Sequence, residues 1–272
     1  AFHDSIARYP PPNCNPGTRE DVIHEIMNWI THGDNKILWL CGPAGAGKSA
    51  IVQYIAECCE DKLTLAASFF FFHADPGRNT IAGLVSSITY QIITRMRHKR
   101  AQIGTVIEED PSILHKPFKA QIEHLIYPLL VDTPSNNINE SPASSGLPSV
   151  IIIDGLDECQ GDNDQREIVQ SIGALANITR NSVRFIVASR PEPPINQSFH
   201  SLPSIRKILL SDPHRIQRAS GDIYLYLRHG FDQIYQKHRP IVESFWPTDS
   251  IISKLVHKSG GLFIYPSIVL KY

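Results

Sequence analysis

The first stretch of the chain whose residues could do chemistry is GPAGAGKSA, residues 42–50. It places three glycines before Lys48 and Ser49 and matches the pattern G-x-x-x-x-G-K-[ST]. Because glycine lacks a Cβ, the backbone can pass close to an anion and turn its N–H groups toward it. At this spacing the lysine would contact phosphate oxygens and the serine hydroxyl a magnesium ion. The stretch therefore predicts a loop that binds a nucleoside triphosphate.

The whole loop is expected to line the nucleotide. An apolar run precedes it and a helical pattern follows it, which is the context that this pattern requires. A glycine-rich turn that matches by chance is the alternative. The expected nucleotide-binding residues of the loop are Gly42, Pro43, Ala44, Gly45, Ala46, Gly47, Lys48, Ser49 and Ala50, and Ser49 is also an expected magnesium ligand.

A second group of acids follows the apolar run VIII, residues 150–153. Asp154 at the end of this run is the expected second magnesium ligand. Gly155 stands where many ATPases with such a loop have a catalytic glutamate, and Asp157 and Glu158 come later. Each of these two acids could polarise an attacking water or could form a salt bridge that holds a neighbouring loop, and the spacing leaves both roles open.

The run VRFIVAS, residues 183–189, ends in front of Arg190. A guanidinium at this sheet edge would contact the γ-phosphate and sense its presence, because arginine stays charged and fits phosphate oxygens. The alternative is an ion pair with Glu192 or with the acids after Asp154.

Five apolar runs predict the strands that must position these groups. They are KILWLC (36–41), LTLAASFFFF (63–72), VIII (150–153), VRFIVAS (183–189) and IRKILL (205–210). Helical spacing lies between most of them: one helix behind a Thr18 N-cap, one over 49–59, and a long one from Asn79 to the basic cluster RMRHKR. Strands that alternate with helices predict a parallel five-stranded sheet flanked by helices.

The distribution of residue types along the chain predicts the domain organisation. Residues 1–17, rich in proline, form an extended lead-in, and residues 18–212 form the nucleotide-binding domain. Within it, residues 132–148 are expected to be a flexible insert because they are rich in Ser, Asn, Pro and Gly. Residues 213–272 read as helices and predict part of a small helical subdomain.

Composition limits the other functions. The chain of 272 residues has 26 Lys+Arg and 27 Asp+Glu, so no global charge attracts nucleic acid or a membrane. No apolar run approaches the roughly 18 residues of a membrane span, and we expect a cytoplasmic protein without membrane or specific nucleic-acid partners. Five cysteines without C-x-x-C spacing are interpreted as reduced thiols.

The assembled motifs resemble the NACHT family of signal-transducing NTPases, in particular those of fungal NLR-like proteins. The resemblance rests on GPAGAGKSAI, IIIDGLDEC, FIVASRPEP, GDIYLYL and HKSGGLFIY, and the lead-in NPGTRE is similar to the segment before such domains. It implies a P-loop NTPase fold of the ASCE/STAND type, with a helical subdomain that clamps ATP or ADP, or in some members GTP, together with Mg²⁺. It also implies that Thr18 and Arg19 lie near the base.

For the full-length protein, the resemblance implies an ADP-bound resting form that converts to an ATP-bound oligomer through its NACHT domains. Effector and repeat domains usually flank this module and are absent from this chain, and we expect the winged helix of such proteins to lie beyond Tyr272. Two residues depart from the family pattern. His73 stands where relatives often have a basic residue, and Pro266 is expected to kink or end the last helix.

Several functions fit these features. The first is a signal-transduction switch in which slow hydrolysis of the nucleotide controls oligomerisation. The second is a nucleotide-stabilised scaffold with little turnover, which Gly155 favours. A DNA-handling AAA+ ATPase has only the cluster RMRHKR (95–100) in its support, and a solvated helix end explains that cluster as well. A small-molecule kinase gives the distal acids no purpose.

Overall fold

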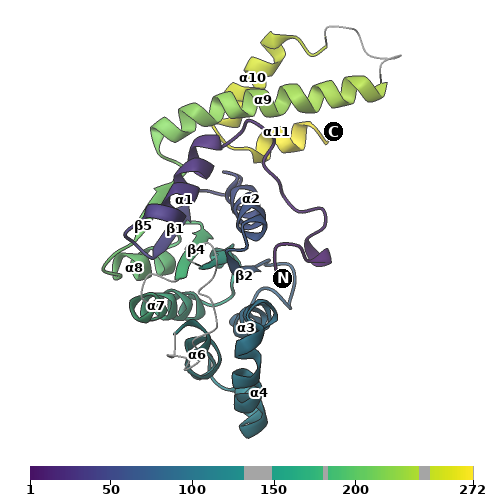
Figure 1. Cartoon of the computed structure of the whole chain (residues 1–272). Helices are drawn as coiled ribbons and strands as arrows, with labels where there is room; N and C mark the ends of the chain where they lie inside the picture. Colours follow the sequence, from purple (N-terminus) through teal and green to yellow (C-terminus); the bar gives the residue numbers. More distant parts are fainter. Residues whose placement is uncertain (132–148, 180–182, 239–245, 272) are drawn as a thin grey trace.

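The structure of the chain is a computed structural model (Figure 1) that describes residues 1–131, 149–179, 183–238 and 246–271. The expected flexible insert, residues 132–148, lies outside the described residues.

Five parallel strands form one sheet in the order β2-β3-β4-β1-β5. The strands are β1 (Ile37–Cys41), β2 (Leu65–Phe70), β3 (Ser149–Asp154), β4 (Val183–Ser189) and β5 (Arg206–Leu209). Each lies within or next to an apolar run of the sequence, so the expected parallel five-stranded sheet is confirmed. Because β4 pairs with both β1 and β3, the carboxyl ends of these three strands lie side by side.

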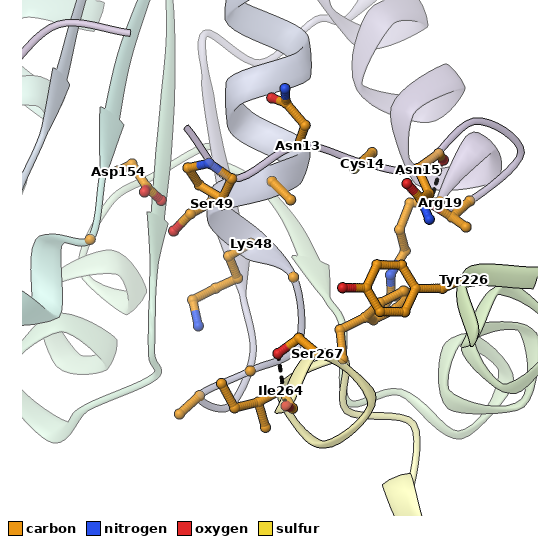
Figure 2. Close-up of a pocket in the computed structure, with 18 of the residues that line it drawn as sticks. Asn13, Cys14, Asn15, Arg19, Lys48, Ser49, Asp154, Tyr226, Ile264 and Ser267 are labelled. Atoms are coloured by element: carbon orange, nitrogen blue, oxygen red, sulfur yellow. Dashed lines mark hydrogen bonds between the residues drawn. The ribbon is translucent and has the colours of Figure 1, made fainter. Parts of the chain in front are cut away.

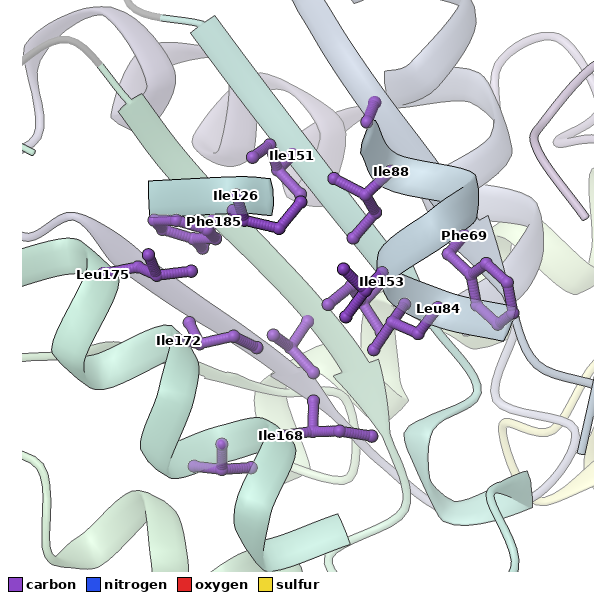
Figure 3. Close-up of a cluster of buried hydrophobic side chains, with 14 of the residues drawn as sticks. Phe69, Leu84, Ile88, Ile126, Ile151, Ile153, Ile168, Ile172, Leu175 and Phe185 are labelled. Carbon is purple, nitrogen blue, oxygen red and sulfur yellow. The ribbon is translucent and has the colours of Figure 1, made fainter. Parts of the chain in front are cut away.

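Helices cover both faces of the sheet, because alternate residues of each strand point to opposite faces. One face packs on α1 (Glu20–His32) and α2 (Lys48–Asp61). The other packs on α3 (Leu84–Arg95), α7 (Asp162–Ile178) and α8 (Pro193–His200). Figure 3 shows the second core, where apolar side chains of α3 and α7 surround those of the central strands: Leu84, Ile88, Ile151, Ile153, Ile168, Ile172, Leu175 and Phe185.

The segment between β2 and α7 differs from the expectation of one long helix from Asn79 to the basic cluster. Before β3 it contains η2 (Ile81–Gly83), α3, η3 (Arg97–Lys99), α4 (Arg100–Glu109), η4 (Pro111–His115), α5 (Phe118–Gln121), η5 (Ile122–Ile126) and α6 (Tyr127–Leu130), and η6 (Leu156–Glu158) follows β3. Asn79 does not start a helix, because its side chain donates to the His73 carbonyl and its own carbonyl accepts from Gln160. The end of α3 at Arg95, the first residue of the basic cluster, agrees with the expectation, since Met96 leaves helical geometry at ψ 73°.

The start of α1 also differs from the prediction. The Thr18 hydroxyl donates to the Asn15 carbonyl at 2.7 Å and does not cap the helix. The N-cap residue is Arg19, which has a left-handed conformation with φ 58° and no side-chain cap bond. The prediction of a Thr18 N-cap is therefore wrong, because a local turn at Asn15 takes up the threonine hydroxyl.

The last described part of the chain forms three helices, α9 (Pro213–His238), α10 (Asp249–Ser259) and α11 (Ile264–Val269). A small apolar cluster joins α9 and α10 through Ile223, Leu227, Phe231 and Ile252, and Val269 of α11 packs against it. In Figure 1 the three helices lie beyond α1 and α2, on the side away from α7. Pro266 neither kinks nor ends α11, because it is the third residue of the helix, where the N–H has no intrahelical partner. Among the described residues, no helix is long and apolar enough to cross a membrane.

Candidate nucleotide-binding site

A cleft of about 590 Å³ opens at the carboxyl ends of β1, β3 and β4. The loops after these strands form one wall. The lead-in segment before α1 and the helices α9 and α11 supply the other lining residues. Figure 2 shows Ser49 and Asp154 on one side of the start of α2, and Arg19 and Tyr226 on the other. The cleft therefore lies where the sheet, the lead-in and the C-terminal helices meet.

The loop after β1 has the backbone that an anion cradle needs. Gly45 and Gly47 have φ values of +74° and +93°, in the region that favours glycine. A Cβ on Gly45 would lie 2.4 Å from Ile264 Cγ2, so the loop also lets α11 approach closely. Gly47 is the N-cap residue of α2, and the 14-residue helix directs the positive end of its dipole into the cleft.

Lys48 folds back over this loop. Its amino group donates to the carbonyls of Gly42 at 2.8 Å and Pro43 at 3.0 Å, and its side chain lines the cleft. Burial lowers the pKa of the Lys48 ammonium, while the negative charges of Asp157 and Asp154 oppose that shift. The loop carbonyls thus hold the ammonium at the mouth of the cradle, where a phosphate could compete for it.

Asp154 is the most deeply buried acid of the site, with 4% of its surface exposed. Burial raises the pKa of its carboxyl from 3.8 to about 6, against a hydrogen bond from the Ser49 side chain and the positive charges of Arg8 and Lys48. Its Oδ1 is buried without a hydrogen-bond partner. A buried carboxylate oxygen without a partner is costly, and a bound cation would satisfy it.

Ser49 and Asp154 suit a magnesium ion that shares its ligands with phosphate and water, not a metal held by protein groups alone. Among the described residues, no cluster of three or more His, Cys, Asp or Glu side chains could hold a metal. Magnesium in phosphate sites usually takes one or two protein oxygens and completes its shell with water and phosphate oxygens. The hydroxyl and the partnerless carboxylate oxygen supply two such ligands.

Asp157 and Arg190 form an ion pair and a backbone hydrogen bond. The Arg190 backbone N–H donates to Asp157 Oδ1 at 2.9 Å, and the Arg190 Nε lies 3.1 Å from Asp157 Oδ2. The Asp157 side chain is 7% exposed and that of Arg190 is 47% exposed. The ion-pair alternative is thus what the structure contains, although both side chains also line the cleft.

Glu158 is tied to the segment after β2. Its Oε2 accepts from the His73 backbone N–H at 3.0 Å, and the His73 ring Nδ1 lies 3.4 Å away. The Asn79 side chain donates to the His73 carbonyl, and the Asn79 carbonyl accepts from the Gln160 N–H. Hydrogen bonds thus join the segment of Glu158 and Gln160 to the segment from His73 to Asn79 at two points. Glu158 is also one of the residues that line the cleft.

The structure brings most of the sequence-predicted residues to this cleft. Its lining includes Thr18, Arg19, Ala44, Gly45, Gly47, Lys48, Ser49, Ala50, Asp154, Asp157, Glu158 and Arg190. Gly42, Pro43 and Ala46 are not among the lining residues. Their carbonyls instead accept from Lys48 and from Arg19, which maintains the shape of the loop.

Sequence reasoning assigned no role to several other lining residues. They are Pro10, Pro12, Asn13, Cys14 and Asn15 of the lead-in, and Tyr226, Phe263, Ile264, Ser267 and Lys271 of the C-terminal helices. Asn15, Tyr226, Phe263 and Ile264 stand inside the stretches NPGTRE, GDIYLYL and HKSGGLFIY, which carried the resemblance. Those stretches were the signal, but nothing in them tells which side chain faces a cleft.

Comparison with known proteins identifies one family. The family model described as Nephrocystin 3, N-terminal matches residues 17–190, which include the loop after β1, the acids after β3 and Arg190. This is a NACHT-like family related to the P-loop NTPases, so the resemblance is confirmed at that level. No curated protein matches the chain. Among solved structures, "Structure of C. elegans PCH-2" matches with 13% identity and a TM-score of 0.46 over 93% of this chain and 64% of that one.

Proposed function

The chain belongs to the Nephrocystin 3, N-terminal family, and we propose that it is a nucleotide-binding switch module with the P-loop NTPase fold of NACHT domains. ATP or ADP, with GTP as the other triphosphate, would occupy the cleft with Mg²⁺. One observation carries the proposal: Lys48, Ser49 and the partnerless oxygen of Asp154 converge at the N-terminus of α2.

Residues of this chain would bind each part of the ligand. The loop 42–47 and the first turn of α2 would hold the phosphates through N–H groups, and Lys48 would exchange its loop carbonyls for phosphate oxygens. Ser49 and Asp154 would hold Mg²⁺, which neutralises phosphate charge when bound. The strand order supports the proposal, since β4 alone separates the strand before the loop from the strand that ends in Asp154.

Slow hydrolysis is part of the proposal, with Glu158 to orient the water and Arg190 to sense the γ-phosphate. For these roles Glu158 would have to leave the His73 N–H, or share it with water, and Arg190 would have to share Asp157 with the phosphate. In the full-length protein the nucleotide state would control self-association through the same domains.

A second function has its own support. If the chain is a nucleotide-stabilised scaffold with little turnover, Asp157 and Glu158 are structural acids. Each accepts a backbone N–H from another segment, and Gly155 occupies the usual position of the base. The basic cluster gives little support to a DNA-handling ATPase, because Arg95 pairs with Glu60 at 2.6 Å and Lys99 donates to the Leu129 carbonyl.

Calorimetric titration with ATP, ADP and GTP, with and without Mg²⁺, tests the proposal. Lys48→Ala is expected to weaken binding of each nucleotide by about ten- to hundredfold, as expected for the loss of a charged hydrogen bond. Lys119→Ala is the matched control, because Lys119 is exposed on α5 and outside the cleft. Equal binding by both variants and the wild type would contradict nucleotide binding in this cleft.

Phosphate release under single-turnover conditions then separates the two functions. A switch is expected to release phosphate slowly, and Glu158→Gln to slow the release further without weakening ATP binding. Tight binding with no release above the background would favour the scaffold.

A further inference from the structure

Arg19 adopts a backbone conformation that bulky residues rarely adopt. Its φ is 58° and its ψ is 19°, and only 3% of the residue is exposed. A side chain at positive φ is strained, so contacts from its surroundings must hold it there. Strained residues of this kind concentrate at functional sites, and Arg19 lines the nucleotide cleft.

The contact that holds the Arg19 backbone comes from α9. Asp222 Oδ2 accepts from the Arg19 backbone N–H at 3.0 Å, across 203 residues of sequence. Burial raises the pKa of the Asp222 carboxyl, and this hydrogen bond and the charge of Arg19 oppose the rise. The Arg19 guanidinium also lies over the Phe263 ring, 5.0 Å from its centroid. The strained residue is therefore fixed from the C-terminal helices.

The Arg19 side chain in turn fixes one peptide group of the loop. Its Nη2 donates to the Ala46 carbonyl at 2.7 Å. In a planar trans peptide the C=O and the following N–H point in opposite directions. The Gly47 N–H must therefore point away from Arg19, and Figure 2 shows Lys48 on the other side of the start of α2. Among the described residues, no hydrogen bond engages the Gly47 N–H.

We propose that Asp222 and Arg19 are positioning residues for phosphate binding. Asp222 holds Arg19 in its strained conformation, Arg19 holds the Ala46 carbonyl, and the Gly47 N–H is thereby free for a phosphate oxygen. The inference rests on the proposed nucleotide site and deepens it. Release of α9 would free Arg19 and let the 46–47 peptide rotate, so phosphate binding and docking of α9 favour each other.

A double-mutant cycle on ADP binding tests the chain of contacts. Arg19→Asn removes the guanidinium but tolerates positive φ, and Asp222→Ala removes the acceptor. Each variant is expected to weaken ADP binding in Mg²⁺ by about tenfold. Because the two residues act in series, the double variant should bind no more weakly than Arg19→Asn. Asp222→Asn keeps a neutral acceptor and should restore most of the affinity.

Asp232→Asn is the matched control, because Asp232 is an exposed acid on the same helix. It is expected to bind ADP as the wild type does. Additive effects of Arg19→Asn and Asp222→Ala would overturn the inference, since they would mean independent structural roles. If Arg19→Asn does not fold, as judged by circular dichroism, the comparison of Asp222→Ala with Asp222→Asn decides in the same way.

Nuclear magnetic resonance of a glycine-labelled chain provides a readout that a purely structural role would not move. Pyrophosphate is expected to shift the Gly47 amide proton downfield in the wild type and in Asp232→Asn, and much less in Asp222→Ala. An equal shift in all three would overturn the inference. If Lys48→Ala loses ADP while Arg19→Asn and Asp222→Ala bind normally, the nucleotide site stands and the inference falls. A wild-type chain that binds neither ADP nor pyrophosphate would overturn both.

Discussion

Replacing Asp154 by asparagine is expected to stabilise the ligand-free protein while it removes the proposed magnesium ligand. The carboxylate is almost fully buried, and its Oδ1 has no hydrogen-bond partner. Ionising such a group in the folded chain is unfavourable, and asparagine has nearly the same shape without the charge.

The shifted pKa gives the magnitude. Burial raises the carboxyl pKa from 3.8 to about 6, so the folded state binds this proton more tightly than the unfolded state does. The stability that the protonated group contributes is therefore complete below pH 3.8 and is lost as the pH rises through about 6. The pKa rises by about 2 units, and each unit corresponds to about 1.36 kcal/mol. Ionised Asp154 therefore lowers the free energy of unfolding above pH 7 by about 3 kcal/mol.

Urea denaturation of the ligand-free wild type and Asp154→Asn, followed by tryptophan fluorescence, measures this difference. At pH 7.5 the variant is expected to be more stable by about 2 to 3 kcal/mol. At pH 4.5 the difference should fall to about 1 kcal/mol, because the carboxyl of the folded wild type is then protonated while that of the unfolded chain is still mostly ionised. In calorimetry at pH 7.5, Mg²⁺ should strengthen ADP binding to the wild type and hardly affect ADP binding to the variant.

Asp232→Asn is the control for the loss of one negative charge, and its stability is expected to match the wild type at both pH values. The reasoning would be refuted if Asp154→Asn were no more stable than the wild type at pH 7.5, or if the difference were the same at pH 4.5. Either result would mean that the carboxylate is already satisfied in the folded chain.

Three further predictions concern the surroundings of the site. Gly45→Ala should displace α11, because the new Cβ would lie 2.4 Å from Ile264 Cγ2 and φ is +74°. Faster limited proteolysis after residue 259 and weaker ADP binding would show this displacement. Cleavage at the wild-type rate would contradict the prediction. Thr248→Ala removes the N-cap of α10, whose side chain accepts from Ile251 N. We expect a stability loss of about 1 kcal/mol in urea with unchanged ADP affinity. Arg190→Ala should weaken ATP binding more than ADP binding if the guanidinium contacts the γ-phosphate; a loss of stability alone would support only its ion pair with Asp157.

Local patterns in the sequence were sufficient for the elements. Apolar runs marked all five strands, and their alternation with helical segments indicated a parallel sheet covered on both faces. The spacing of glycines and Lys48 located the loop between β1 and α2. These features depend on neighbouring residues and on burial, which periodicity and composition report directly.

Helix boundaries were less predictable, because tertiary contacts compete with local caps. Thr18 has the residue type of an N-cap, yet its hydroxyl bonds to Asn15 and a carboxylate from α9 takes the next backbone N–H. Asn79 likewise serves contacts with His73 and Gln160 instead of starting a helix.

The sequence by itself determined which segments become strands, which glycine-rich loop joins β1 to α2 and which acid ends the central strand. Only the tertiary structure decided what those groups contact: Asp157 with Arg190, Glu158 with the His73 N–H, and Arg19 between Asp222 and the Ala46 carbonyl. The physical reason is range. A pattern of neighbouring residues records the face that a side chain occupies, whereas an ion pair across 33 residues or a hydrogen bond across 203 depends on how whole elements pack.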